Sequence, residues 1–387
     1  MATLKYKLPS PYTTVASPPP VEDEAYTRHL QDLRLTSPSN NQTYGVAIFG
    51  IGRAGTIHLR NLLNNRRTEL LYVVDDDVNK LQKIKNYYSI NTNTTQLITS
   101  KDGKLVYQDP RVRFVVISSP TFTHEELIRE ALTNRKAVFC EKPIADNIES
   151  TIKMFQLAKQ VNQPLFSAFN RRFDPSYLSL RNRVRAGEVG KVLTVKVHSR
   201  DSPLPTLEYL KISGGFFHDS CVHDIDQILF ALGELPDKVV SFSHANIPEI
   251  KAIDDYDNIS ALLSFPSGAN GIIDLNRHCT YGYEQRLEVF GEKGMLKAEN
   301  KAALDNVEFY TEKGVSKVPI DYSFASRFKE AYEMEIEHFV EVLDGTTELR
   351  VTENTNLAVS KIATALEESA RSGKIVHLTW TAKEAIN

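Results

Sequence analysis

The stretch Tyr44–His58, which reads YGVAIFGIGRAGTIH, decides the fold. It begins with the apolar run Val46–Phe49, whose length and β-branched content suit a buried strand. The next six residues, Gly50–Gly55, fit the pattern G-x-G-x-x-G, and apolar side chains then recur at helical spacing. In a strand–turn–helix unit the three glycines allow a tight turn, close approach of a pyrophosphate, and close packing of helix on strand. The free N–H groups of the helix N-terminus face the phosphate charge.

This turn therefore predicts a dinucleotide site whose cofactor contacts come from Gly50, Ile51, Gly52, Arg53, Ala54 and Gly55. A second apolar run, Leu70–Val74, ends in the acidic triplet Asp75–Asp77. An acid at this position accepts hydrogen bonds from the ribose hydroxyls and repels a 2′-phosphate. No arginine follows it closely, so Asp75 favours NAD over NADP. The alternative is that Asp75 only begins a turn.

The composition, with 41% hydrophobic and 25% charged residues in 387, is that of a globular protein, and the length suggests two or three domains. A net charge of −3 gives no sign of nucleic-acid binding. No apolar run reaches the roughly 18 residues that would span a membrane. The three cysteines, Cys140, Cys221 and Cys279, show no paired spacing. Free thiols and a cytoplasmic location are therefore expected.

Residues 1–43 are predicted to form a flexible N-terminal extension with one short helix at Glu22–Leu33. The segment is rich in proline at Ser17–Pro20 and acidic at Val21–Glu24. It lacks the apolar core of a signal peptide, and its acidic cluster argues against a mitochondrial transit sequence. Two roles are open: an extension without part in the chemistry, or a segment that drapes over a neighbouring subunit.

Residues 44–168 alternate strand and helix, which predicts an α/β domain of the Rossmann type. Such a domain is a doubly wound parallel sheet with helices on both faces. A third strand, Phe114–Ile117, is followed by the loop Ser118–His124. Ligands of such sheets bind beyond the carboxyl ends of the strands. Ser119, Pro120 and His124 are therefore expected beside the cofactor.

The next strand, Ala137–Cys140, ends in Glu141-Lys142-Pro143. A lysine at the carboxyl end of a strand lies on the ligand side of the sheet. There its charge can polarise a substrate oxygen, and burial can lower its pKa. A Glu-Lys-Pro loop taken alone is more often ordinary surface. Its place after a strand of a dinucleotide fold favours a role for Glu141 and Lys142 at the site.

Residues 169–387 are predicted to form a substrate-binding and oligomerisation domain of the α+β class. Six strand-like runs, separated by short turns, are Val192–Arg200, Lys238–Ala245, Asp257–Phe265, Gly271–Arg277, Gln285–Phe290 and Met295–Ala298. Short turns between consecutive strands imply a largely antiparallel sheet. Two arginines lie in the stretch FNRRFDP at 169–175. Either both form solvated ion pairs or one faces a polyhydroxylated substrate.

A helical pattern from Phe217 onward places Asp219 and His223 four residues apart, on one helix face and within reach of each other. A carboxylate that binds one imidazole nitrogen raises the basicity of the other, which suits a general base for an alcohol proton. The commoner alternative is a purely structural pair. A metal site of His218, Asp219 and His223 is disfavoured, because His218 lies about 100° around the helix from Asp219. No metal is expected.

These motifs together resemble the Gfo/Idh/MocA oxidoreductase family of glucose–fructose oxidoreductase and inositol 2-dehydrogenase. The resemblance extends from about Tyr44 to Leu366. Its markers are the glycine loop with Arg53 and His58, the Glu-Lys-Pro loop, and Gly214-Gly215 leading to Asp219 and His223. Within the family, the stretches 169–175, 199–201 and 281–286 are similar to those of the inositol dehydrogenases. The loop 202–207 differs somewhat from the proline-rich loop expected there.

The resemblance implies that Lys142, Asp219 and His223 form the catalytic set and bind the substrate. It also implies polyol contacts from Asn170, Arg171, Tyr281 and Tyr283. The expected activity is NAD-dependent oxidation of a secondary hydroxyl of a cyclic polyol, foremost myo-inositol to its 2-keto product. The alternatives are scyllo-inositol or a hexose on the same site, or a non-catalytic regulator that senses NAD. Relatives of this kind imply a homodimer or homotetramer.

Overall fold

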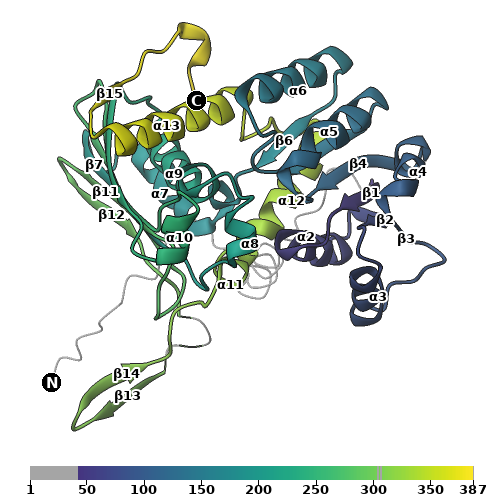
Figure 1. The fold of residues 1–387 in the computed structure, drawn as a ribbon, viewed down its shortest axis with the longest axis horizontal. Helices are drawn as coiled ribbons and strands as arrows, with labels where there is room; N and C mark the ends of the chain where they lie inside the picture. Colours follow the sequence, from purple (N-terminus) through teal and green to yellow (C-terminus); the bar gives the residue numbers. More distant parts are fainter. Residues whose placement is uncertain (1–41, 303–304, 306, 387) are drawn as a thin grey trace, which may run out of the picture. The chain divides into compact units, whose positions relative to one another are not determined.

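The computed structural model describes residues 42–302, 305 and 307–386. The predicted helix Glu22–Leu33 and nearly all of the predicted N-terminal extension lie outside the described residues. The chain from Thr43 onward forms one unit, which Figure 1 shows in colours from purple to yellow.

A six-stranded parallel sheet carries the predicted dinucleotide motif, within the described part of the chain, in the order β3-β2-β1-β4-β5-β6 (Figure 1). Its strands are β1 (Tyr44–Phe49), β2 (Thr68–Val74), β3 (Gln96–Ile98), β4 (Val112–Ile117), β5 (Ala137–Glu141) and β6 (Leu165–Ala168). All neighbours in this sheet run parallel. The order reverses between β1 and β4, and ligands of doubly wound sheets bind at such a switch point.

Helices cover both faces of this sheet. They are α2 (Arg53–Asn64), α3 (Val78–Tyr87), α4 (Lys104–Gln108), α5 (His124–Thr133) and α6 (Ile148–Val161). On one face Ile128 of α5 and Phe155 of α6 join the buried core, and on the other Leu59 of α2 does so. The strands are buried on both faces, which explains their nearly continuous apolar sequence.

The second sheet is built from seven strands of the described residues, in the order β12-β11-β7-β10-β9-β8-β15. They are β7 (Val192–Arg200), β8 (Lys238–His244), β9 (Asn258–Ser264), β10 (Asn270–Asn276), β11 (Glu284–Gly291), β12 (Gly294–Ala298) and β15 (Val376–His377). Neighbouring strands are antiparallel except β7 and β10. A separate two-stranded hairpin consists of β13 (Glu308–Thr311) and β14 (Gly314–Lys317).

The helices of this part lie on one face of the seven-stranded sheet (Figure 1). They are α7 (Pro175–Arg185), α9 (Val222–Leu232) and α13 (Glu353–Ser372), with the shorter α8 (Leu207–Leu210), α10 (Pro248–Ala252) and α11 (Phe324–Arg327) nearby. Helix α12 (Lys329–Leu343) instead returns to the parallel sheet, where the ring of Phe339 lies 5.4 Å from that of Phe114.

The expected fold class, a Rossmann-type parallel sheet followed by an α+β part with a largely antiparallel sheet, is confirmed. The division into domains 44–168 and 169–387 stays a prediction.

Candidate active site

A cavity of about 500 Å³ opens at the carboxyl ends of the parallel strands. The glycine loop after β1, the loops after β4 and β5, and the segment 213–223 before and within α9 all contribute to its wall. Side chains from the seven-stranded sheet, among them Ser199 and Gln285, complete it. The cavity thus joins the two halves of the chain at the place where a doubly wound sheet binds its ligand.

The glycine loop has the geometry that a pyrophosphate needs. Gly50 has φ 82, and a Cβ there would lie 2.6 Å from the backbone of Ser119. A Cβ at Gly55 would lie 2.1 Å from the carbonyl oxygen of Gly50. A Cβ at Gly52 would meet no atom within 4 Å, so its backbone borders open space at the start of α2. These residues therefore fit the diphosphate of NAD, which the free N–H groups of α2 would bind.

Asp75 lies at the end of β2 and lines the cavity. Its Oδ2 accepts a hydrogen bond of 2.9 Å from the N–H of Ile51, and its Oδ1 accepts one of 2.9 Å from Asp77. A carboxylate offers about four acceptor positions, so two such bonds leave room for ribose hydroxyls. Ile51 is buried, and its N–H is engaged with Asp75.

The loop after β4 places Ser119 and Pro120 at the cavity, together with Arg53 and Ala54 from the glycine loop. His124 is buried behind them. Its Nε2 lies 2.9 Å from the carbonyl oxygen of Ser119, and its Nδ1 lies 2.8 Å from that of Pro143. His124 therefore joins two loops of the site and is not itself part of the cavity wall.

Lys142 and Asp219, 77 residues apart in the sequence, meet at the cavity. The Nζ of Lys142 donates a hydrogen bond of 2.6 Å to the carbonyl oxygen of Asp219 and lies 3.2 Å from its Oδ1. Burial alone would raise the pKa of Asp219, but the charges of Lys142 and Arg277 outweigh it and hold the pKa below its usual value. Asp219 is therefore an ionised carboxylate that fixes the ammonium group at the end of β5.

The predicted contact between Asp219 and His223 is wrong. Nδ1 of His223 is buried and has no hydrogen-bond partner among the described residues, whereas Asp219 bonds to Lys142 and to the hydroxyl of Tyr209. The reason is a π-helical turn at Phe217–Cys221, which precedes α9. A π turn closes with an i→i+5 bond, so residues four apart do not stack as they do in an α-helix.

His223 still lines the same cavity as Lys142. Its imidazole is buried, and burial together with the charges of Lys142 and Arg171 lowers its pKa well below the usual value. The ring is therefore neutral at physiological pH. A neutral imidazole in a cavity with an ammonium group can accept a proton from a hydroxyl.

Asn170, Arg171 and Tyr283 also line the cavity. Nη1 of Arg171 donates a hydrogen bond of 2.6 Å to Asp224, and its Nη2 lies 3.4 Å from the hydroxyl of Tyr283. Arg172 does not line the cavity, and its guanidinium pairs with Asp226. Both arginines are buried in ion pairs, and Arg171 is the one that borders the cavity.

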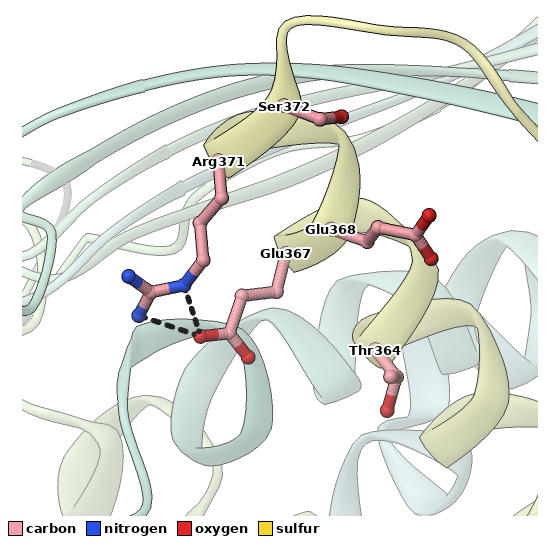
Figure 2. A pocket seen from close by; sticks show the side chains of 5 residues that line it. All are labelled: Thr364, Glu367, Glu368, Arg371 and Ser372. Atoms are coloured by element: carbon pink, nitrogen blue, oxygen red, sulfur yellow. Dashed lines mark hydrogen bonds and ion pairs between the residues drawn. The ribbon is translucent and has the colours of Figure 1, made fainter.

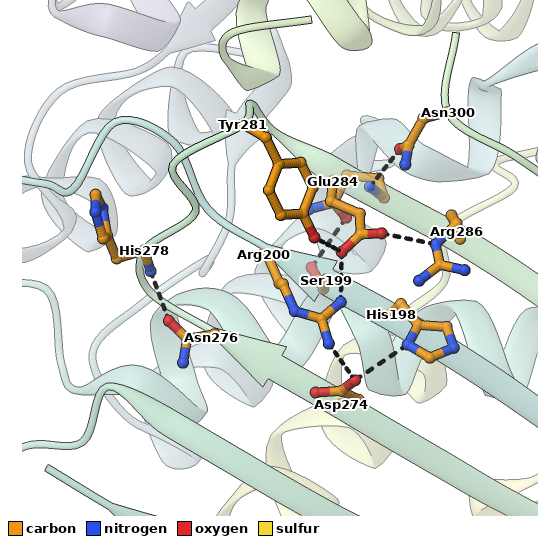
Figure 3. A network of polar contacts seen from close by, with 11 residues as sticks. His198, Ser199, Arg200, Asp274, Asn276, His278, Tyr281, Glu284, Arg286 and Asn300 are labelled. Atoms are coloured by element: carbon orange, nitrogen blue, oxygen red, sulfur yellow. Dashed lines mark hydrogen bonds and ion pairs between the residues drawn. The ribbon is translucent and has the colours of Figure 1, made fainter. Parts of the chain in front are cut away.

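Tyr281 lies outside this cavity. Its hydroxyl donates a hydrogen bond of 2.7 Å to Glu284, within a polar network that also contains Arg200 and Asp274 (Figure 3). In an extended strand, residues two apart share a face. Tyr281 and Tyr283 come before β11 begins at Glu284, and Gly282 between them has φ 126, so this alternation does not apply to the two tyrosines.

Three residues to which the sequence assigned no role also belong to this region: Asp201, Tyr209 and Arg277. The hydroxyl of Tyr209 lies 2.9 Å from Oδ1 of Asp219. Arg277 is fully buried, and its Nη1 lies 3.6 Å from Oδ2 of Asp219. Burial raises the pKa of Asp201, which lines the cavity, to about 6. Asp201 lies in the stretch 199–201 that resembles the inositol dehydrogenases, whereas Tyr209 and Arg277 stand in no recognisable motif, so only the folded chain identifies those two.

His218 does not join Asp219 and His223 but lies 3.3 Å from Glu367 of α13. In the described part of the chain, the side chains whose ligand atoms converge closely enough for a metal ion are His58, Glu141 and Glu335. Nε2 of His58 lies 2.8 Å from Glu141, so this group already contains one direct contact.

A second depression lies along α13, between Thr364 and Ser372 (Figure 2). Three charged side chains line it, Glu367, Glu368 and Arg371, and Glu367 pairs with Arg371 at 2.9 Å. Paired surface charges leave little for a ligand, so this depression is a weak candidate for chemistry.

No helix among the described residues has the length and apolar content needed to cross a lipid bilayer.

Two family models match the chain. The model of the oxidoreductase family, NAD-binding Rossmann fold, matches residues 44–169, and that of the GFO/IDH/MocA C-terminal domain matches residues 177–297. Inositol 2-dehydrogenase of Rhizobium meliloti is 34% identical over 328 residues, which are 84% of this chain and 97% of the relative.

Solved structures of inositol dehydrogenases are also similar to this chain. A myo-inositol dehydrogenase from Corynebacterium glutamicum has a TM-score of 0.79 at 31% identity and covers 88% of this chain and 100% of its own. A scyllo-inositol dehydrogenase from Lactobacillus casei with bound NAD(H) and scyllo-inositol has a TM-score of 0.78 at 27% identity, covering 87% and 99%.

Proposed function

The chain belongs to the GFO/IDH/MocA oxidoreductase family, and we propose that it is an NAD-dependent dehydrogenase that oxidises myo-inositol to its 2-keto product. One observation carries this proposal. A single cavity contains the glycine loop of the dinucleotide motif, the ammonium group of Lys142 and the neutral imidazole of His223. Oxidation of an alcohol by NAD needs a place for the cofactor, a group that accepts the hydroxyl proton and a charge that stabilises the oxygen, and these three parts can supply them.

We assign the proton of the reacting hydroxyl to His223, which accepts it as the general base. The ammonium group of Lys142 binds the same oxygen and stabilises the negative charge that develops on it. Asp219 orients that ammonium group through the contacts of 2.6 and 3.2 Å. NAD, when bound on the glycine loop, supplies the hydride acceptor for the carbon that carries the hydroxyl.

The remaining hydroxyls of a cyclic polyol need several polar partners at fixed positions. Asn170, Arg171 and Tyr283 at the cavity offer donors and acceptors for them. The buried ion pair with Asp224 holds Arg171 in one arrangement, and Nη2 of Arg171 lies 3.4 Å from the hydroxyl of Tyr283. Such a wall suits an uncharged, polyhydroxylated ring.

Two alternatives remain. The structural relative that binds scyllo-inositol favours an isomeric inositol as a second candidate substrate, with a hexose after it. A regulator that senses NAD without catalysis would have no need of Lys142, Asp219 and His223 together, and their common cavity weighs against it.

The test is a panel of inositol isomers and hexoses, each assayed with NAD by the absorbance of NADH. We expect the fastest turnover with myo-inositol. His223→Ala should lower kcat by about 10³-fold, since general-base catalysis contributes about 10²–10⁴, while NAD still binds. His218→Ala is the matched control, because that imidazole pairs with Glu367 and should leave turnover near the wild-type value. Wild-type turnover in His223→Ala would refute the assignment.

We further propose a homodimer or homotetramer in the cytoplasm. The face of the seven-stranded sheet that no described helix covers exposes Phe242, Leu262, Phe290 and Met295. An apolar sheet face of this kind favours pairing between subunits. The three free cysteines, all buried, suit a reducing compartment.

A further inference from the structure

Arg277, which follows β10, is a charged side chain with no exposed surface. A buried charge is costly unless it is paired and hydrogen-bonded. Nη2 of Arg277 donates a hydrogen bond of 2.8 Å to Oδ2 of Asp255, and its Nε donates one of 3.2 Å to the carbonyl oxygen of Tyr256. Its Cζ lies 4.2 Å from the centre of the Phe216 ring. The guanidinium group is thus held firmly in one place.

The same contacts hold the turn that carries Asp219. Oδ1 of Asp255 accepts a hydrogen bond of 2.9 Å from the N–H of Phe216, the residue before the π-helical turn. The N–H of Asp219 donates one of 2.9 Å to the carbonyl oxygen of Gly215. Asp255 therefore links Arg277 to the backbone at the start of the turn. The adjacent residue, Gly215, accepts the hydrogen bond from the N–H of Asp219, so this link reaches the residue that carries the carboxylate.

The third guanidinium nitrogen of Arg277, Nη1, differs from the other two. Nη1 has no hydrogen-bond partner among the described residues and lies 3.6 Å from Oδ2 of Asp219. The other carboxylate oxygen, Oδ1, faces Lys142 and Tyr209. The two oxygens of Asp219 thus face two different cations, one fixed in the interior and one at the cavity.

The charged and titratable groups around Asp219 come from separate elements. Lys142 follows β5, Tyr209 lies on α8, Arg277 follows β10, and Asp201 follows β7. Burial raises the pKa of Asp219, and Lys142 and Arg277 are the two charges that lower it. Lys142 must share its ammonium group with the substrate oxygen under the proposed function. An arginine stays protonated throughout the working pH range.

We propose that Arg277 is a positioning residue that holds Asp219 in place as an ionised carboxylate while Lys142 binds the substrate oxygen. The kinetic part of this inference rests on the proposed function. Arg277 does not itself line the cavity, and it acts through Asp219, which does.

The kinetic test compares Arg277→Met and Arg277→Lys with the wild type over a range of pH. In Arg277→Met we expect the acidic limb of the kcat/KM profile to move up by about one pH unit or more, the usual effect of removing an opposite charge at this distance. Arg277→Lys should recover part of the shift. The charges that act on His223 are Lys142 and Arg171, so a titration of His223 would not produce this result. Arg277 also lowers the pKa of Asp201, so the comparison is repeated in the Asp201→Asn background, where the shift should persist.

Arg172→Met is the matched control, because Arg172 is a buried arginine paired with Asp226. It should lower stability without moving the acidic limb. If Arg277→Met does not fold, Arg277→Gln, which removes the charge and can still donate a hydrogen bond to Asp255, should give a shift in the same direction. An unchanged profile in all the folded variants, or an equal shift in Arg172→Met, would overturn the inference.

A second measurement does not depend on turnover. In protein labelled with ¹³C at the aspartate carboxyl groups, the resonance of Asp219 is identified by its loss in Asp219→Asn. Its titration should move to higher pH in Arg277→Met and stay unchanged in Arg172→Met. If the wild type oxidises no polyol and this titration still moves, the proposed function fails while the assignment of Arg277 stands. If polyols are oxidised and the titration does not move, the assignment of Arg277 fails alone.

Discussion

Asp201 and Asp219, two carboxyl groups at the cavity, have pKa values that move in opposite directions. Burial raises the pKa of Asp201 to about 6, and the nearby charge of Asp219 adds to the effect. At Asp219, burial is outweighed by the cations Lys142 and Arg277, and the pKa falls. Near pH 6 the cavity therefore gains or loses one negative charge at Asp201, while Asp219 stays ionised.

Asp201→Asn tests this difference. Ionised Asp201 would accept hydrogen bonds from polyol hydroxyls, so in the wild type the KM for the polyol should fall as the pH rises through about 6. Hydrogen bonds to charged groups contribute about 1.5–3 kcal/mol, so the variant should show a KM about tenfold higher above that pH. It should also lose the pH dependence. Initial rates at varied polyol concentration measure both effects, with the KM for NAD as the internal control. A variant that keeps the wild-type pH dependence would contradict the role of Asp201.

Glu335 on α12 offers a test of stability. It is fully buried, and neither of its carboxylate oxygens has a partner in the described part of the chain. Burial and the charge of Glu141 raise its pKa well above the usual value. When the pKa of a carboxyl group is higher in the folded than in the unfolded protein, its protonated form stabilises the fold. This stabilisation is complete below the pKa of the unfolded protein, about 4.3 for Glu, and is lost as the pH rises through the pKa of the folded protein.

Glu335→Gln should therefore raise Tm by about 2–4 °C for each kcal/mol gained, and the gain should grow as the pH is raised from about 4.3, the unfolded value, toward neutrality. Thermal unfolding across this range measures the gain. Glu333→Gln, an exposed position of the same helix, should show no such trend. A lower Tm for Glu335→Gln at every pH would show that the carboxyl group has a stabilising partner.

At the scale of elements, the strands of the parallel sheet were predictable because burial on both faces leaves nearly continuous apolar runs such as Val46–Phe49. Strand β3 (Gln96–Ile98) was not predicted, since three residues are too short to show any period. The strands of the second sheet alternate inward and outward side chains, and β7 matches its predicted bounds Val192–Arg200.

The π-helical turn is the element that sequence periodicity could not reveal. Phe217 and Val222 fit a helix in either case, because apolar spacing does not distinguish a π turn from an α turn over five residues. The predicted pairing of Asp219 with His223 failed for this reason. Sequence reasoning placed both residues, with Lys142, at one site, but the partner of Asp219 comes from β5 and depends on the fold as a whole.

The glycine loop gives a prediction that separates binding from packing. A Cβ at Gly52 meets no atom within 4 Å, and one at Gly55 would lie 2.1 Å from the carbonyl oxygen of Gly50. Gly52→Ala should change the free energy of unfolding by less than about 1 kcal/mol yet lower the affinity for NAD at least about tenfold, since the methyl group would occupy the place of the diphosphate.

Gly55→Ala should instead lower the free energy of unfolding by about 1–3 kcal/mol, the usual cost of overpacking. Urea unfolding and calorimetric titration with NAD measure the two quantities in both variants. Equal losses of stability in the two variants would mean that Gly52 does not border the cofactor site.

At the scale of the whole molecule, the site exists because the chain crosses between its two sheets more than once. Lys142 directly follows strand β5 of the parallel sheet, and Asp219 precedes a helix that packs on the other sheet. Helix α12 then returns to the parallel sheet, where Phe339 packs on Phe139 at 5.8 Å. This return fixes the two halves against each other, so the proposed catalytic groups depend on contacts far from the cavity.

The uncovered face of the seven-stranded sheet gives the last prediction. Leu262 lies in the middle of β9, opposite Val240 of β8 and Ile272 of β10, and 49% of its surface is exposed. If this face joins two subunits, Leu262→Lys places a charge in the interface and should dissociate the oligomer, which light scattering after gel filtration would detect as a lower mass. Leu105→Lys is the matched control, because Leu105 is 47% exposed on α4, beside the other sheet, and should leave the mass unchanged. A wild-type protein of monomer mass, or an unchanged oligomer in Leu262→Lys, would show that this face does not pair.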